Sequence, residues 1–154
     1  MPFKSIVPLT FALCFSGQAL AFGNTDAWTR GYAQGTAEYT ILGKEQSQLY
    51  LACKSTGSQA VTIIFTDVNG HQVGMDGGQK LTMKIDNADE ADISESESHV
   101  GSGNLMWAWN KLRTGKRVVV TSSGARPAVF TLNGAAGVIP AFGDNGCVAK
   151  FDIQ

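Results

Sequence analysis

The chain has 154 residues, 44% hydrophobic and 16% charged, with 12 Lys and Arg against 13 Asp and Glu. This length is sufficient for one domain with a core of its own. A formal net charge of −1 argues against the broad positive surface with which proteins bind nucleic acid or an anionic membrane.

The first 21 residues have the three parts of a secretory signal peptide. Met1–Lys4 carries one positive charge, Ser5–Phe15 is uncharged and mostly apolar, and Ala19–Ala21 fits a signal peptidase site. The apolar run is shorter than the roughly 20 residues that a membrane span needs, and no later run approaches that length. We therefore expect a signal peptide over residues 1–21 and a soluble protein that is periplasmic or secreted.

The expected mature chain is one β-rich domain, residues 22–154. It keeps 11 basic and 13 acidic residues, a net charge of −2. Cys14 lies in the expected signal peptide. A lipid anchor on it is disfavoured, because a lipobox has a small residue directly before the cysteine and this position is Leu13.

Two cysteines belong to the expected mature chain, Cys53 and Cys147. In an oxidising compartment they are expected to pair, and closing a loop of this length contributes roughly 4 to 5 kcal/mol. The alternative is a catalytic thiolate, which needs an activating positive neighbour. The chain has two histidines, His71 and His99, and neither lies in a motif known for that role.

Strand patterns dominate the first half of the chain. Glu38–Leu42 and Gln48–Cys53 are rich in aromatic and branched residues. Residues 61–75 predict a hairpin in which Asn69-Gly70 supplies the positive φ angles of a two-residue type I′ turn. After a reversal at residues 76–78, residues 81–85 alternate strictly, which predicts one buried and one solvated face. Tight turns between these neighbours predict an antiparallel sheet.

Residues 86–99 form the most acidic segment, and three interpretations are open. The acids are Asp86, Asp89, Glu90, Asp92, Glu95 and Glu97. Calcium binding is the first, although the spacing departs from the EF-hand pattern. A surface that faces a partner is the second. A solvated loop or a charged edge that discourages aggregation is the third.

A helix is predicted over residues 104–113, since Leu105, Trp109 and Leu112 follow helical spacing. Ser102 or Asn104 would cap its start, and Gly115 would end it in the left-handed conformation. A strand with Leu105, Trp107 and Trp109 on one face is the alternative.

In the helix, Trp107 points roughly opposite Leu105 and Trp109. An outward tryptophan is a candidate interface anchor, and a second layer that covers it is the alternative. The basic residues Lys111, Arg113, Lys116 and Arg117 follow. They complement the helix dipole, and they are also a candidate recognition patch for an acidic partner.

The rest of the chain predicts further strands at residues 116–122, 128–132 and 147–153, with one or two helical turns in 135–142. The fold class is therefore mainly β, a single-domain antiparallel β-sandwich or partly open barrel of seven to nine strands with one or two short helices. Trp28 is expected to be a core or edge aromatic.

No catalytic motif stands out. "VGSGN" (100–104) lacks the spacing of a nucleophile elbow, and "RTGKR" (113–117) lacks a Walker glycine pattern. Two histidines 28 positions apart make a zinc site improbable. Nothing singles out a carboxylate pair for hydrolysis.

The C-terminal pattern resembles small bacterial envelope proteins of the invasion-associated locus B type. A tryptophan-bearing helix stops at "TGK" (114–116), a strand "RVVVTS" (117–122) follows, and "FTLNG" (130–134) leads to Cys147. The resemblance covers Leu105–Cys147. It implies an all-β envelope protein without known catalytic residues that serves in secretion or host contact, and it carries over no site residues.

The leading hypothesis is a non-enzymatic binding or accessory protein that acts by contact with another protein in the envelope or outside the cell. An inhibitor or immunity role is one version of it. A small-molecule or glycan-binding module, or a cell-wall hydrolase with an unrecognised carboxylate site, is the alternative. No cofactor is expected. The candidate partner-binding residues are Trp107, Asp89, Glu90, Asp92, Glu95, Glu97, Lys111 and Arg113.

Overall fold

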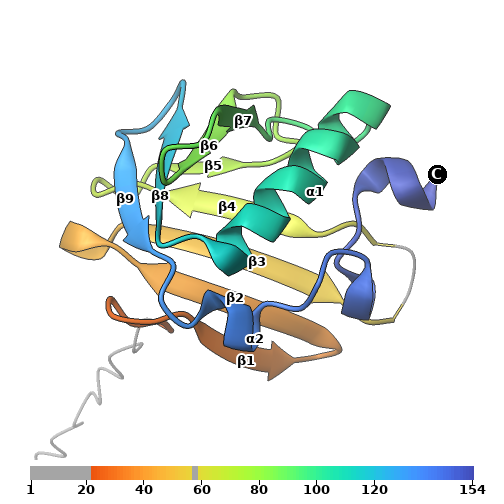
Figure 1. Cartoon of the computed structure of the whole chain (residues 1–154), viewed down its shortest axis with the longest axis horizontal. Coiled ribbons are helices and arrows are strands. Elements are labelled where there is room, and N and C mark those ends of the chain that lie inside the picture. Colours follow the sequence, from red (N-terminus) through yellow and green to blue (C-terminus); the bar gives the residue numbers. More distant parts are fainter. Residues whose placement is uncertain (1–21, 57–58) are drawn as a thin grey trace, which may run out of the picture.

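The computed structural model describes residues 22–56 and 59–154 (Figure 1). The predicted signal peptide, residues 1–21, lies outside the described residues. In the described part of the chain, no helix is long and apolar enough to cross a membrane.

The described residues form nine strands, two α-helices and three 3₁₀ segments. In chain order they are β1 (Thr29–Ala33), β2 (Thr36–Leu42), η1 (Lys44–Gln46), β3 (Gln48–Lys54), β4 (Thr62–Thr66), β5 (Gln72–Gly74), β6 (Leu81–Ile85), β7 (Glu90–Asp92), α1 (His99–Thr114), β8 (Arg117–Ser122), β9 (Ala128–Thr131), α2 (Ala135–Val138), η2 (Asp144–Gly146) and η3 (Lys150–Ile153).

The strands form two antiparallel sheets, which confirms the predicted mainly β class. Sheet A has the order β1-β2-β3-β4-β5, and sheet B has the order β7-β6-β8-β9. Their apolar faces meet in one core, where the rings of Phe65 and Phe130 lie edge to face with centroids 6.2 Å apart. Trp28 is buried there, and its indole Nε1 donates to the Thr131 carbonyl, which links the start of β1 to β9.

The alternation predicted for β6 is only partly right. Leu81, Met83 and Ile85 are buried as expected, but Thr82 is buried as well. Thr82 pairs with Asp92 of β7 and Thr121 of β8, whereas Lys84, the other residue on this face, stays exposed as predicted.

Helix α1 crosses the opening between the two sheets and closes the core on that side (Figure 1). It begins at His99, earlier than the predicted start. The predicted caps, Ser102 and Asn104, are wrong, because the Ser98 hydroxyl accepts from the Gly101 amide at 2.9 Å. The helix therefore runs through the Gly-Ser-Gly segment that interrupts the apolar pattern.

Gly115 ends α1, but not in the predicted left-handed conformation, since its φ is −79°. A Cβ at this position would lie 2.6 Å from Ile85 Cγ2 and 3.0 Å from Leu132 Cδ1. Close approach of the helix end to the core explains the glycine.

The two-residue turn predicted at Asn69-Gly70 is wrong. β4 and β5 are joined by residues 67–71, in which Gly70 alone has a positive φ, 82°. The buried Asp67 carboxylate organises this connection by accepting from the amides of Asn69 at 2.8 Å and His71 at 2.9 Å. A third amide, that of Arg126, lies 59 positions away and donates at 2.8 Å.

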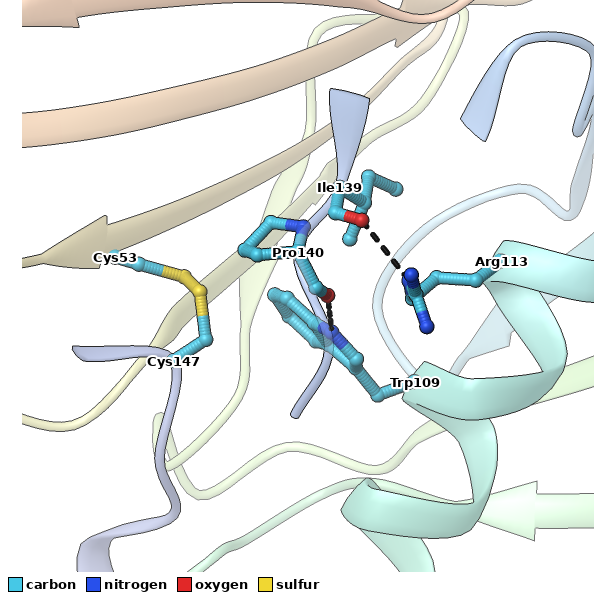
Figure 2. Close-up of a disulfide and its surroundings, with 6 residues drawn as sticks. All are labelled: Cys53, Trp109, Arg113, Ile139, Pro140 and Cys147. Atoms are coloured by element: carbon cyan, nitrogen blue, oxygen red, sulfur yellow. Dashed lines mark hydrogen bonds between the residues drawn. A yellow bond between two sulfur atoms is a disulfide. The ribbon is translucent and has the colours of Figure 1, made fainter. Parts of the chain in front are cut away.

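The predicted disulfide is confirmed, since Cys53 of β3 bonds to Cys147 (Figure 2). The strand predicted at residues 147–153 is wrong. Its backbone crosses the end of the sandwich, where the Val61 amide donates to Val148 and the Phe151 amide donates to Ser96. Because these contacts reach different elements, the segment forms η3 and joins neither sheet.

Candidate functional site

Helix α1 separates its apolar side chains into a buried set and an exposed set. Leu105, Trp109 and Leu112 are fully buried, whereas Trp107 keeps 36% of its surface exposed. The Trp109 indole donates to the Pro140 carbonyl at 2.9 Å (Figure 2). Trp109 thus fixes the helix on the core, and Trp107 on the opposite side faces outward.

Trp107 borders a small surface pocket. The pocket has a volume of about 270 Å³ and is lined by Asp89, Glu90, Ala91, Asn104 and Trp107. Lys111 Nζ lies 5.7 Å from the centroid of the Trp107 ring, within the range of a cation–π contact. We call Trp107, Lys111, Asp89 and Glu90 the Trp107 site.

The six acids of residues 86–99 do not act as one group. β7 lies within this segment and is one of the two edge strands of sheet B. Glu90 belongs to β7, opposite Lys84, and Asp89 directly precedes it, and both are exposed. The Asp86 carboxylate instead accepts from the amides of Lys116 and Arg117, at 3.1 and 3.0 Å, and so closes a turn.

Three further acids are engaged within the fold. The Ser94 hydroxyl, 2.5 Å from Asp92, lowers the pKa of that carboxyl, and the Ser94 amide contributes too. The Ser98 hydroxyl, 2.6 Å from Glu95, is the main cause of the lowered pKa of Glu95. Glu97 pairs with Lys150. Of the predicted acids, only Asp89 and Glu90 line the Trp107 pocket.

The basic cluster is divided in the same way. Lys111 belongs to the Trp107 site, whereas the half-buried Arg113 donates from Nε to the Ile139 carbonyl at 2.9 Å (Figure 2). Lys116 and Arg117 use their backbone amides to hold Asp86. Arg113 thus supports the fold next to Trp109, and the four cations form no continuous patch.

A hollow of about 470 Å³ lies beside β7, lined by Asp76, Gly78, Gln79, Lys80, Asp92, Ser94, Glu95 and Glu97. The pKa values of Asp92 and Glu95 are both lowered. A general acid near neutral pH needs a raised carboxyl pKa, so these two groups are shifted in the opposite direction. Within residues 22–56 and 59–154, no three His, Cys, Asp or Glu side chains are placed to hold a metal ion.

Sequence analysis missed a groove between α1 and η3. It has a volume of about 280 Å³ and is lined by His99, Ser102, Gly103, Met106, Phe142, Phe151 and Asp152. The Ser102 hydroxyl donates to Asp152 at 3.3 Å, and the His99 ring packs against Phe151. Ser102 and Asp152 thus bond without His99 between them, unlike a catalytic triad. Because residues 147–153 were predicted as a strand, no groove between this segment and the helix was expected.

One comparison with known proteins gives a match. The model of the YfjT family matches residues 26–139, about three quarters of the chain, and its description names no activity. No curated protein and no solved structure matches the chain. The match includes both sheets, helix α1 and the Trp107 site. The chain therefore belongs to the YfjT family.

Proposed function

We propose that this protein is a periplasmic or secreted binding or accessory protein, without enzymatic activity, that acts by contact with another protein. The observation that carries the proposal is the Trp107 site. An exposed tryptophan beside a pocket is the kind of anchor that dominates protein–protein binding energy. Two carboxylates, Asp89 and Glu90, border the same pocket.

The disulfide supports a location outside the cytoplasm. Cys53 and Cys147 are both fully buried and 94 positions apart in sequence. Disulfides of this structural kind form and persist in oxidising compartments. The signal peptide proposed at residues 1–21 would deliver the chain to one.

The charges of the Trp107 site favour a basic partner. Asp89 and Glu90 line the pocket, and Lys111 lies at the Trp107 ring. An arginine or lysine side chain of the partner would meet the two carboxylates, which outnumber Lys111 and complement a cation. An inhibitor that covers the basic cleft of an enzyme is one protein with this chemistry.

Affinity capture with the protein purified after export tests the proposal. The bait is incubated with envelope extract and culture medium, and retained proteins are identified by mass spectrometry. We expect one stoichiometric basic protein. Trp107→Ala is expected to weaken its binding by at least about 30-fold, because truncating a central anchor costs about 2 kcal/mol or more.

Charge reversal separates this site from general electrostatics. Asp89→Lys with Glu90→Lys removes the acidic border of the pocket, whereas Glu45→Lys changes an exposed acid in η1. Capture that is lost in the double variant and kept in Glu45→Lys supports the site. Equal loss in both, or no retained protein, contradicts the proposal and directs the search to small ligands, glycans and hydrolase substrates.

A further inference from the structure

A pocket of about 510 Å³ lies between η1, the turn that joins β2 to β3, and the edge strand β9 of sheet B (Figure 1). Its volume is within the range of small-ligand sites in proteins, and it shares no lining residue with the Trp107 site. Val68, Pro127, Ala128 and Val129 give it an apolar wall. Val129 is 48% exposed, so a ligand can reach this wall.

The turn on the other side of the pocket has an unfavourable backbone conformation. Glu45 and Gln46 have positive φ angles of 55° and 65°, although asparagine or glycine is usual at such positions of a tight hairpin turn. The turn lies directly on β9, because Gly43 has no Cβ, and one built there would lie 3.0 Å from Phe130 Cε1. Strained turns of this kind cluster at ligand sites, and a wall fixed before binding lowers the cost of ordering it.

The charged side chains of the pocket favour a singly charged anion. Lys44, Arg117 and Glu45 line it, two cations and one carboxylate, which leaves a net charge of +1. Within the described residues, neither the Lys44 ammonium nor the Arg117 guanidinium forms an ion pair. A carboxylate balances this charge, whereas a doubly charged phosphate would bring an excess negative charge close to Glu45.

The free edge of β9 adds a backbone donor. The Leu132 amide donates to the Lys116 carbonyl at 2.9 Å, which fixes the alternation of hydrogen bonds between β8 and β9. In this register Val129 and Thr131 turn their amides and carbonyls away from β8. The Thr131 carbonyl accepts from Trp28 Nε1, whereas no partner of the outward Val129 amide lies within the described residues.

From these features we propose that the pocket binds a carboxylate attached to an apolar group. The apolar group packs on Val68, Pro127 and Val129, and the carboxylate lies between Lys44 and Arg117. Arginine suits this role because its planar guanidinium donates two parallel N–H bonds to a carboxylate. The site goes beyond the proposed function, which concerns the Trp107 site and a basic partner.

Two kinds of molecule have this chemistry, a free aliphatic acid and the C-terminus of a peptide. Isothermal titration calorimetry of the exported protein compares octanoate with an acetylated tripeptide that ends in leucine. Octanamide and the amide of the tripeptide are the uncharged counterparts. We expect an acid to bind at least about tenfold more tightly than its amide, because it gains charge-assisted hydrogen bonds. The acid with the lower dissociation constant identifies the source.

Matched variants test whether binding occurs in this pocket. Lys44→Gln and Arg117→Gln are each expected to raise the dissociation constant of the acid at least about tenfold. The Arg117→Gln variant keeps the backbone amide that holds Asp86. Lys84→Gln is the control, since Lys84 is an exposed cation of β6 that does not line the pocket, and it should leave binding unchanged. Glu45→Gln should lower the dissociation constant, because it removes a negative charge from the pocket.

Three results overturn the inference. They are no saturable binding of either acid, equal binding of an acid and its amide, and equal dissociation constants for Lys44→Gln, Arg117→Gln and Lys84→Gln. Thermal melting followed by circular dichroism checks that each variant is folded. Partner capture that depends on Asp89 and Glu90 does not require this pocket, so these results leave the proposed function standing.

Discussion

Removing the disulfide is the perturbation whose size can be worked out most directly. Cys53 and Cys147 are 94 positions apart, and the chain-entropy model gives a closure of this length about 4 to 5 kcal/mol. For about 133 residues, an unfolding entropy of about 2.1 cal/mol/K per residue amounts to about 0.28 kcal/mol/K. Dividing the two predicts that the melting temperature falls by about 16 °C.

Urea denaturation measures the corresponding loss of unfolding free energy. It is carried out on the oxidised protein, the reduced protein and the Cys53→Ala/Cys147→Ala double variant. Oxidised and reduced protein have the same heavy atoms in their side chains, so their difference reports the cross-link. The further difference to the double variant reports the loss of two buried sulfur atoms. A loss of less than about 2 kcal/mol on reduction would refute the assumption that the unfolded chain is free enough to gain this entropy.

Two further predictions concern the core and the β4–β5 connection. Trp109→Ala removes a fully buried side chain and its bond to Pro140 and should cost about 3 to 5 kcal/mol in urea denaturation; Trp107→Ala, the exposed control, should cost far less. Three amides, that of Arg126 foremost, hold the pKa of Asp67 at about 2, below 3.8. A folded pKa below the unfolded value means that this stabilisation is present above pH 4 and is lost as the pH falls toward 2. The urea midpoint of Asp67→Asn should therefore vary less with pH between about 2 and 4 than that of the unmodified protein. If the midpoint of both proteins changes equally with pH, the assignment is contradicted.

The strands were predictable wherever a short local run carries the signal. β2 and β3 follow from runs of aromatic and branched residues, and β6 follows from alternating side chains, although each of the three also has consecutive buried residues. The segment 147–153 also alternates, yet it forms η3 because its hydrogen-bond partners, Val61 and Ser96, lie far away in sequence. Local periodicity has no information about which distant backbone groups are available.

In the candidate site, too, the features that depend on nearby residues were predictable and those that depend on distant residues were not. The outward position of Trp107 follows from the spacing of Leu105, Trp109 and Leu112 on one helix. The acids of residues 86–99 could not be sorted by sequence, because Glu97 is engaged by Lys150, more than 50 positions away. Asp67 was overlooked for a similar reason, since one of its three amide donors belongs to Arg126. The Asp-x-Asn-Gly pattern at 67–70 was the available local signal.

The order of strands in the sheets has a consequence for how the chain folds. Every neighbour in sheet A is also a neighbour in sequence, so the sheet can grow one strand at a time from residues 29–74. Pairing of this kind closes only short loops and is fast. The Cys53–Cys147 bond, by contrast, joins sheet A to a segment beyond sheet B. We therefore expect the disulfide to form late in folding. The rate of its formation would then report how fast the two sheets dock.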